Sequence, residues 1–150
     1  MSVIYLGLFL DEESQVRLLD AVDALLRIER YPNTHSHHLT LAYQPEDSQV
    51  QDYTPHIGRE ITLAVNRIVL NDGVIAAKVD RAQFPDWVTY CQPYPHITIA
   101  CAEGVKPMMS NAVLKSRVYD SLVLYNPVLL QATMGVYTYR DGVVTEGVLL

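Results

Sequence analysis

Two stretches of the chain, His38-Leu39-Thr40-Leu41-Ala42 and His96-Ile97-Thr98-Ile99-Ala100, repeat one order of residue types. Each begins with a histidine, which is followed by an aliphatic residue, a threonine, a second aliphatic residue and an alanine. In a β-strand successive side chains point to opposite faces, so the histidine and the threonine share one face while the aliphatic residues point to a core. Each stretch is therefore predicted to form a half-buried strand that carries an imidazole beside a hydroxyl.

These two groups together are suited to phosphate chemistry. An imidazole titrates near neutral pH and can take or give a proton, whereas a hydroxyl can donate a hydrogen bond to an anionic oxygen. One His-x-Thr sequence occurs by chance on the polar face of many strands, and it is the repeat that indicates a function. Two such pairs facing each other would hold a phosphate. The predicted catalytic residues are His38, Thr40, His96 and Thr98.

The composition is typical of one globular domain. The chain has 150 residues, 49% of them hydrophobic and 19% charged, which suits a single domain over residues 1–150. No apolar run approaches the roughly 20 residues that span a bilayer, and Met1 is not followed by the basic start of a signal peptide. We expect a soluble, cytoplasmic protein without a membrane partner, in which Cys91 and Cys101 stay unpaired.

The net charge of −6 bears on the possible partners. Binding along a nucleic-acid backbone depends on lysine and arginine side chains that neutralise phosphates, so an acidic chain is not expected to bind duplex DNA. One or two phosphates can still be held by local donors. A small nucleotide or the end of a strand therefore remains a possible ligand.

The pattern of hydrophobic residues predicts an α+β domain dominated by antiparallel strands. Val3–Leu10 reads as a strand. An amphipathic helix follows that is capped within Asp11-Glu12-Glu13-Ser14, has Val16, Leu19, Val22 and Leu25 or Leu26 on its apolar side, and ends before Pro32. The remaining expected elements are the first motif strand, a loop or short helix over Gln44–Gly58, a hairpin of Glu60–Leu70 and Val74–Val79 turning at Asn71-Asp72-Gly73, an irregular segment over Arg81–Tyr94, the second motif strand, a short helix capped by Ser110 or Asn111, and strands over Ser121–Tyr125, Val128–Tyr139 and Val143–Leu150.

The two His-x-Thr motifs resemble those that define the 2H phosphoesterases, and the resemblance covers nearly the whole chain. It implies a two-lobed fold whose antiparallel sheets line a central cleft, with helices outside and one motif strand from each lobe. It also implies an enzyme, a phosphodiesterase that needs no metal ion or other cofactor. In such a site a neutral imidazole deprotonates water, and a protonated imidazole gives its proton to the leaving oxygen. The sequence leaves open which histidine is the acid and which is the base.

The resemblance also bears on the substrate. The most similar 2H groups are cyclic phosphodiesterases that open 2′,3′-cyclic phosphates, including the domain of fungal-type tRNA ligases, which the stretch Lys106-Pro107-x-x-Ser110-Asn111 resembles. The resemblance to these cyclic phosphodiesterases implies that the substrate is a nucleotide or an RNA end. The alternative is a cyclic oligonucleotide, the immune signal that viral 2H enzymes degrade. Further contacts to phosphate or nucleotide are expected from Tyr5, Tyr43, Tyr94, Lys106, Ser110 and Asn111.

Two other functions stay open. The first is a nucleotide-binding module that has the same cleft but no turnover, although both motifs keep the residues that catalysis needs. The second is a metal-dependent hydrolase, because His35, His37, His38 and His56 are potential ligands. No carboxylate or thiol follows at ligand spacing, and adjacent His37 and His38 would point to opposite sides of a strand. We therefore expect no metal site, and His37 is predicted to be a solvated neighbour.

Overall fold

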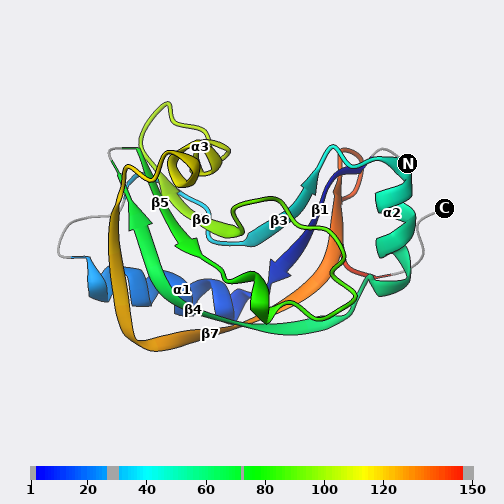
Figure 1. Ribbon diagram of the computed structural model, residues 1–150, viewed down its shortest axis with the longest axis horizontal. Helices are drawn as coiled ribbons and strands as arrows, with labels where there is room; N and C mark the ends of the chain where they lie inside the picture. Colours follow the sequence, from blue (N-terminus) through cyan, green and yellow to red (C-terminus); the bar gives the residue numbers. More distant parts are fainter. Residues whose placement is uncertain (1–2, 27–30, 72, 147–150) are drawn as a thin grey trace.

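A computed structural model describes residues 3–26, 31–71 and 73–146, and β-strands make up most of its regular secondary structure (Figure 1). The helices and strands follow one another along the chain in this order: β1 (Val3–Leu10), α1 (Glu12–Leu25), β2 (Asn33–Thr34), β3 (His38–Tyr43), α2 (Asp47–Tyr53), η1 (Thr54–His56), β4 (Glu60–Leu70), β5 (Val74–Lys78), η2 (Arg81–Gln83), β6 (His96–Cys101), α3 (Met109–Ser116), β7 (Asp120–Thr138) and β8 (Gly142–Val144).

The strands form one closed antiparallel sheet. Within the described residues, six strands follow one another in the order β1-β3-β6-β5-β4-β7, and β7 pairs again with β1 to close the ring. The closing pair extends from Val3 opposite Thr138 to Leu10 opposite Ala132. The two short strands lie at the margins of this ring, β2 against β6 and β8 against β7.

The predicted fold class, a two-lobed α+β fold with sheets lining a cleft, is wrong. The strands β3 and β6 carry the two motifs and were expected in separate lobes, but they are direct neighbours in the closed sheet. The described part of the chain is mostly β-structure, and its α-helices are short, with 14, 7 and 8 residues. Periodicity predicts strands but not their distant partners. The pairing of β1 with β7, which turns the sheet into a ring, therefore has no local signal in the sequence.

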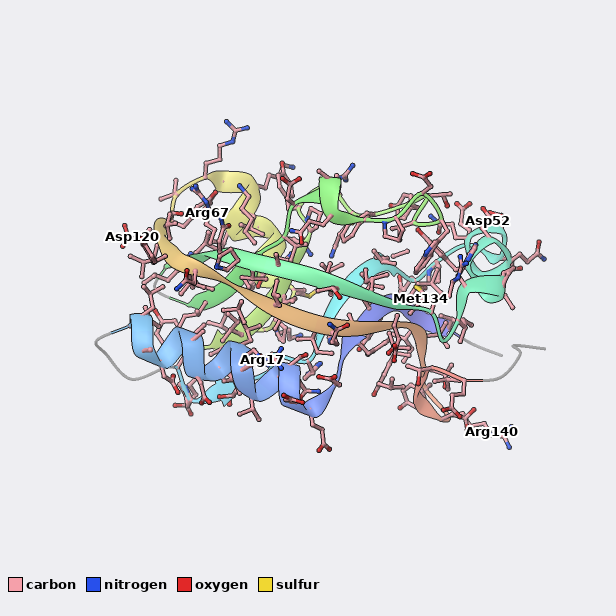
Figure 2. All side chains as sticks on the ribbon, turned by 90° about the horizontal axis from the view of Figure 1, so that it is seen from below. Arg17, Asp52, Arg67, Asp120, Met134 and Arg140 are labelled. Atoms are coloured by element: carbon pink, nitrogen blue, oxygen red, sulfur yellow. The ribbon has the colours of Figure 1, made fainter. Side chains whose placement is uncertain are left out.

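Helix α1 packs against β7 below the sheet (Figure 2). Its N-cap is the predicted Asp11, whose carboxylate accepts a hydrogen bond from the Ser14 amide at 2.7 Å. The predicted Val22 and Leu26 are buried, but Val16 is 55% exposed, and Ser14 and Leu18 are buried in its place. The Ser14 hydroxyl accepts a hydrogen bond from the Gln131 amide of β7 at 2.8 Å. This polar contact with β7 lies on the buried face of the helix, where the apolar pattern predicts no serine.

Strand β7 runs through a segment that was expected to separate two strands. It includes Asn126 and Pro127, and proline lacks the amide hydrogen that a sheet ladder uses. The register against β4 shifts here, because Val65 pairs with Val128 whereas Arg67 pairs with Val123. The extra residues of β7 bulge out at the proline. Pairing therefore resumes on both sides, and one strand of 19 residues results.

The predicted hairpin is confirmed. The hairpin of β4 and β5 forms, and the Asn71 side chain accepts hydrogen bonds from the amides of Gly73 and Val74 at its turn, while Asp72 lies outside the described residues. Cys91 and Cys101 are free thiols. None of the helices in the described ranges has the length and apolar character required to cross a membrane.

Candidate active site

The two motifs lie side by side on adjacent strands. Leu39 of β3 pairs with Ile97 of β6, and both side chains are fully buried in the core. Because the strands are antiparallel, this register sets His38 opposite Thr98 and Thr40 opposite His96. Alternation turns these four polar side chains to the face away from Leu39 and Ile97. The prediction that each motif places its histidine and threonine on one face of a strand is thus confirmed.

A cavity of about 400 Å³ opens over this face. It contains the histidine and the threonine of both motifs, and the segment from His35 to Tyr43 contributes one side of it. The residues that line it are Tyr5, His35, His37, His38, Thr40, Tyr43, Gln92, His96, Thr98, Lys106, Pro107, Met108 and Asn111. Four of the residues that were expected to contact phosphate or nucleotide line this cavity, namely Tyr5, Tyr43, Lys106 and Asn111.

His96 is held by a backbone carbonyl. Its Nδ1 lies 2.6 Å from the carbonyl oxygen of Tyr94, an acceptor only, so Nδ1 carries a proton and Nε2 is left for the cavity. Burial lowers the pKa of His96, and the Tyr94 carbonyl offsets part of this decrease. The imidazole is therefore neutral in the free protein at neutral pH, with the basic nitrogen at Nε2.

His38 is packed between aromatic rings. Its imidazole stacks on Tyr5, with ring centroids 4.7 Å apart, and its Nδ1 lies 2.5 Å from Nδ1 of His37. Burial, followed by the nearby His37, His96 and His35, lowers the pKa of His38 to about 3. Burial and Tyr137 raise the pKa of Tyr5 to about 12, so the Tyr5 hydroxyl keeps its proton. His38, like His96, presents Nε2 as its unengaged ring nitrogen.

His37 is exposed, as predicted, but it lies in the cavity wall beside His38, which corrects the prediction that the two side chains point to opposite sides. The backbone amides of His35 and Ser36 pair with carbonyls of β6, and Ser36 then adopts a left-handed conformation with φ of 62°. This turn comes just before β3 begins at His38. Strict alternation does not apply across such a turn, so the His37 ring stacks on that of His38 at 4.6 Å. Burial and His35 lower the pKa of His37 as well.

The two threonines differ in their surroundings. The Thr98 hydroxyl lies 2.8 Å from the hydroxyl of Ser110, a fully buried residue of α3, and 3.4 Å from the Pro107 carbonyl. Thr40 is fixed through its backbone, because its carbonyl accepts a hydrogen bond from the Gln92 side chain at 2.8 Å. Ser110 therefore contacts Thr98 rather than the cavity. The expected cap at Ser110 or Asn111 is wrong, because α3 begins after Met108 without a side-chain cap.

The irregular segment before β6 contributes to the site in ways that the sequence did not predict. Tyr94 supplies its carbonyl to His96, while its side chain packs on the small core beneath α3. Trp87, an aromatic residue of the irregular segment, stacks on His56, with ring centroids 5.0 Å apart. Gln92 lines the cavity and was missed, because a single glutamine in an irregular segment gives no periodic signal. The amides at the start of α3 already bond to carbonyls of residues 106–108 and are not free for an anion.

The alternative metal site needs its histidines close together. His35, His37 and His38 do line one cavity, but His56 lies elsewhere, against Trp87. In residues 3–26, 31–71 and 73–146, no group of three or more His, Cys, Asp or Glu side chains is arranged so that it could hold a metal ion. The cavity face therefore offers imidazoles and hydroxyls for proton transfer and hydrogen bonding.

Comparison with known proteins identifies the family. A model of the fungal tRNA ligase phosphodiesterase domain matches residues 28–128, which include both motifs. No curated protein matches the chain. The crystal structure of a fungal RNA kinase shares the fold with a TM-score of 0.60 and 16% identity, over 89% of this chain and 46% of that one, so this chain spans about half of its length. The chain belongs to the family of the fungal tRNA ligase phosphodiesterase domain, a family of 2H phosphoesterases.

Proposed function

We propose that the protein is a 2′,3′-cyclic phosphodiesterase that opens the cyclic phosphate of an RNA end or nucleotide, without a metal ion, by acid–base catalysis. The observation that carries this proposal is the register of Leu39 opposite Ile97, which gathers two imidazoles and two hydroxyls on one face. The cavity of about 400 Å³ over this face has room for a nucleotide. Membership in a phosphodiesterase family supports the class of reaction.

The reaction follows from the two imidazoles. One of them, in the neutral form, takes a proton from water as the water oxygen attacks phosphorus, and the other gives its proton to the ribose oxygen as the P–O bond breaks. Both act through Nε2, because Nδ1 of His96 bonds to the Tyr94 carbonyl and Nδ1 of His38 contacts His37. The product is a phosphomonoester. The direction in which the substrate lies decides which histidine is the base.

The hydroxyls and one cation stabilise the phosphate. Thr40 and Thr98 donate to its nonbridging oxygens, and these hydrogen bonds strengthen as negative charge develops in the transition state. The protonated Tyr5 hydroxyl and the ammonium of Lys106 line the same cavity and complement an anion there. A net negative protein can thus hold one phosphate through local donors.

The test is turnover in the presence of EDTA on a panel of substrates. The panel contains 2′,3′-cyclic mononucleotides, RNA oligonucleotides with a cyclic phosphate end, and cyclic di- and trinucleotides. We expect the first two classes to be hydrolysed and EDTA to have no effect. Turnover of cyclic oligonucleotides alone would indicate an enzyme that destroys signalling nucleotides, and binding without turnover would indicate a binding module. Activity that requires an added divalent metal would rule out the two-histidine mechanism.

The pH dependence of the reaction follows from the lowered pKa values of His38 and His96. The reactive form has one imidazole protonated, and this form is most abundant between the two pKa values, both of which lie below the usual 6.5. We expect kcat/KM, which reports the free enzyme, to peak below pH 6.5 and to fall tenfold per pH unit above the higher pKa. The bound phosphate raises both pKa values, so kcat should peak at a higher pH. A kcat/KM that stays constant from pH 6.5 to 9 would contradict the need for a protonated imidazole.

A further inference from the structure

A second hollow lies beside the cavity. It has a volume of about 560 Å³ and will be called the basic groove, because three of the chain's 11 lysine and arginine residues line it. The residues that line it are Ala64, Asn66, Arg67, Lys78, Val79, Asp80, Arg81, Gln83, Pro93 and Pro95. None of these residues belongs to the cavity over the two motifs.

The pairing of the strands places the basic groove in line with the catalytic face. Arg67 of β4 pairs with Lys78 of β5, and Lys78 pairs with His96 of β6. Residues that lie directly opposite each other in antiparallel strands share a face of the sheet. The three side chains therefore form one row across the sheet, and the row continues to Thr40 of β3. With neighbouring strands about 4.8 Å apart, the backbone of Arg67 lies roughly 10 Å from that of His96.

The cavity and the basic groove share one segment of chain as their common wall. Gln92 and His96 line the cavity, whereas Pro93 and Pro95 line the groove. The guanidinium of Arg81 holds this segment in place, because its Nη2 donates to the carbonyls of Cys91 at 3.1 Å and Gln92 at 2.8 Å. A chain-like ligand that leaves the cavity past His96 therefore enters the groove without crossing another element of the sheet.

The cations of the groove are available to an anion. Across residues 3–26, 31–71 and 73–146 the one ion pair joins Arg17 to Glu13, so neither Arg67 nor Lys78 is neutralised by a carboxylate. Both are exposed, and Arg67 donates a hydrogen bond to the Ser121 hydroxyl at 3.2 Å. Asp80 also lines the groove, and its carboxylate accepts a hydrogen bond from the Ala82 amide at 2.9 Å. In a protein of net negative charge, two such cations in one groove can attract an anionic ligand to this place.

We propose that the basic groove binds the phosphates of the RNA chain that precedes the cyclic phosphate, with Arg67 and Lys78 as the contacts. This inference rests on the proposed function and makes it narrower, because it assigns the 3′ end of a single-stranded RNA as the preferred substrate over a free cyclic mononucleotide. The distance from His96 to Arg67 is one that the next nucleotides of a chain can bridge. A groove with cations that follow the backbone is the common way to bind single strands without sequence preference.

The test compares two substrates in matched variants. The double variant Arg67→Gln/Lys78→Gln removes two charges from the groove, and Lys115→Gln/Arg140→Gln removes two exposed charges elsewhere. Arg67 and Arg140 lie at opposite ends of the molecule (Figure 2). We expect the ratio of kcat/KM for an RNA decamer with a cyclic phosphate end to that for the cyclic mononucleotide to fall roughly tenfold in the groove variant alone. The slope of log(kcat/KM) for the decamer against log salt should become shallower by about 0.7 for each phosphate that the variant no longer neutralises.

A binding measurement separates this inference from the proposed function. Fluorescence anisotropy with a decamer that ends in a 3′-phosphate needs no turnover, and the groove variant should bind it roughly tenfold more weakly than the control variant does. If the wild type hydrolyses neither substrate but this difference in binding is found, the proposed reaction is wrong and the groove still binds RNA. Equal binding by the two variants, or an unchanged ratio of kcat/KM, would overturn the inference.

Discussion

The variants His38→Ala and His96→Ala are each expected to lower kcat on a 2′,3′-cyclic nucleotide by about 10²–10⁴-fold. Each variant removes one of the two proton transfers, while the threonines and the cavity remain. The double variant should be little slower than the slower single variant, because the two imidazoles act in one step and residues that act as a unit are not additive. The measurement is the initial rate of phosphomonoester formation in EDTA.

A matched control for these variants is His56→Ala. His56 stacks on Trp87 outside the cavity, and its removal deletes an imidazole without touching the motif face. We expect its rate to remain within a factor of about two of the wild type, the size of an unrelated surface change. Circular dichroism shows whether the slow variants keep the fold. A folded His38→Ala or His96→Ala protein with nearly full activity would contradict the assignment of acid and base.

The candidate site was largely predictable because its signal is local. Alternation within β3 and β6 puts each histidine and threonine on one face whatever the strands pair with. The same local physics places the cap of α1 at Asp11 and the turn at Asn71. What alternation does not give is the identity of the neighbouring strand. The resemblance to 2H phosphoesterases implied that the motifs lie across a cleft between lobes, whereas Leu39 and Ile97 are paired within one sheet.

Other features depend on contacts between distant residues. Gly7 lies in β1 between Thr40 and Gly135, and a Cβ atom on it would come within 2.9 Å of the Leu39 carbonyl. The sequence shows this residue only as an interruption of an apolar strand. In the same way, the left-handed turn at Ser36 brings His37 into the cavity, although serine is compatible with many backbone conformations. Tight packing and backbone turns of this kind are set by the assembled sheet.

The second large expected effect comes from removing the hydroxyl of Thr98 or Thr40. Thr98→Val and Thr40→Val keep the branched shape of the side chain but remove the hydroxyl that donates to the phosphate. We expect each to lower kcat by about 10²–10³-fold with a smaller change in KM, because the hydrogen bond is strongest in the transition state. Thr62→Val on β4, outside the cavity, is the matched control, and its rate should be that of the wild type.

Ser110 acts through Thr98 in this scheme and is a positioning residue. Each hydroxyl has one proton. A Ser110 hydroxyl that donates to Thr98 at 2.8 Å leaves the Thr98 proton, whose acceptor in the free protein is the Pro107 carbonyl at 3.4 Å, to turn to a bound phosphate. Ser110→Ala should lower kcat by about tenfold, the effect of one neutral hydrogen bond, and Ser110→Thr should restore part of it. In the Thr98→Val background, Ser110→Ala should have no further effect on kcat, because the hydroxyl that it orients is gone. Full additivity of the two changes would show that Ser110 supports the fold of α3 rather than the orientation of Thr98.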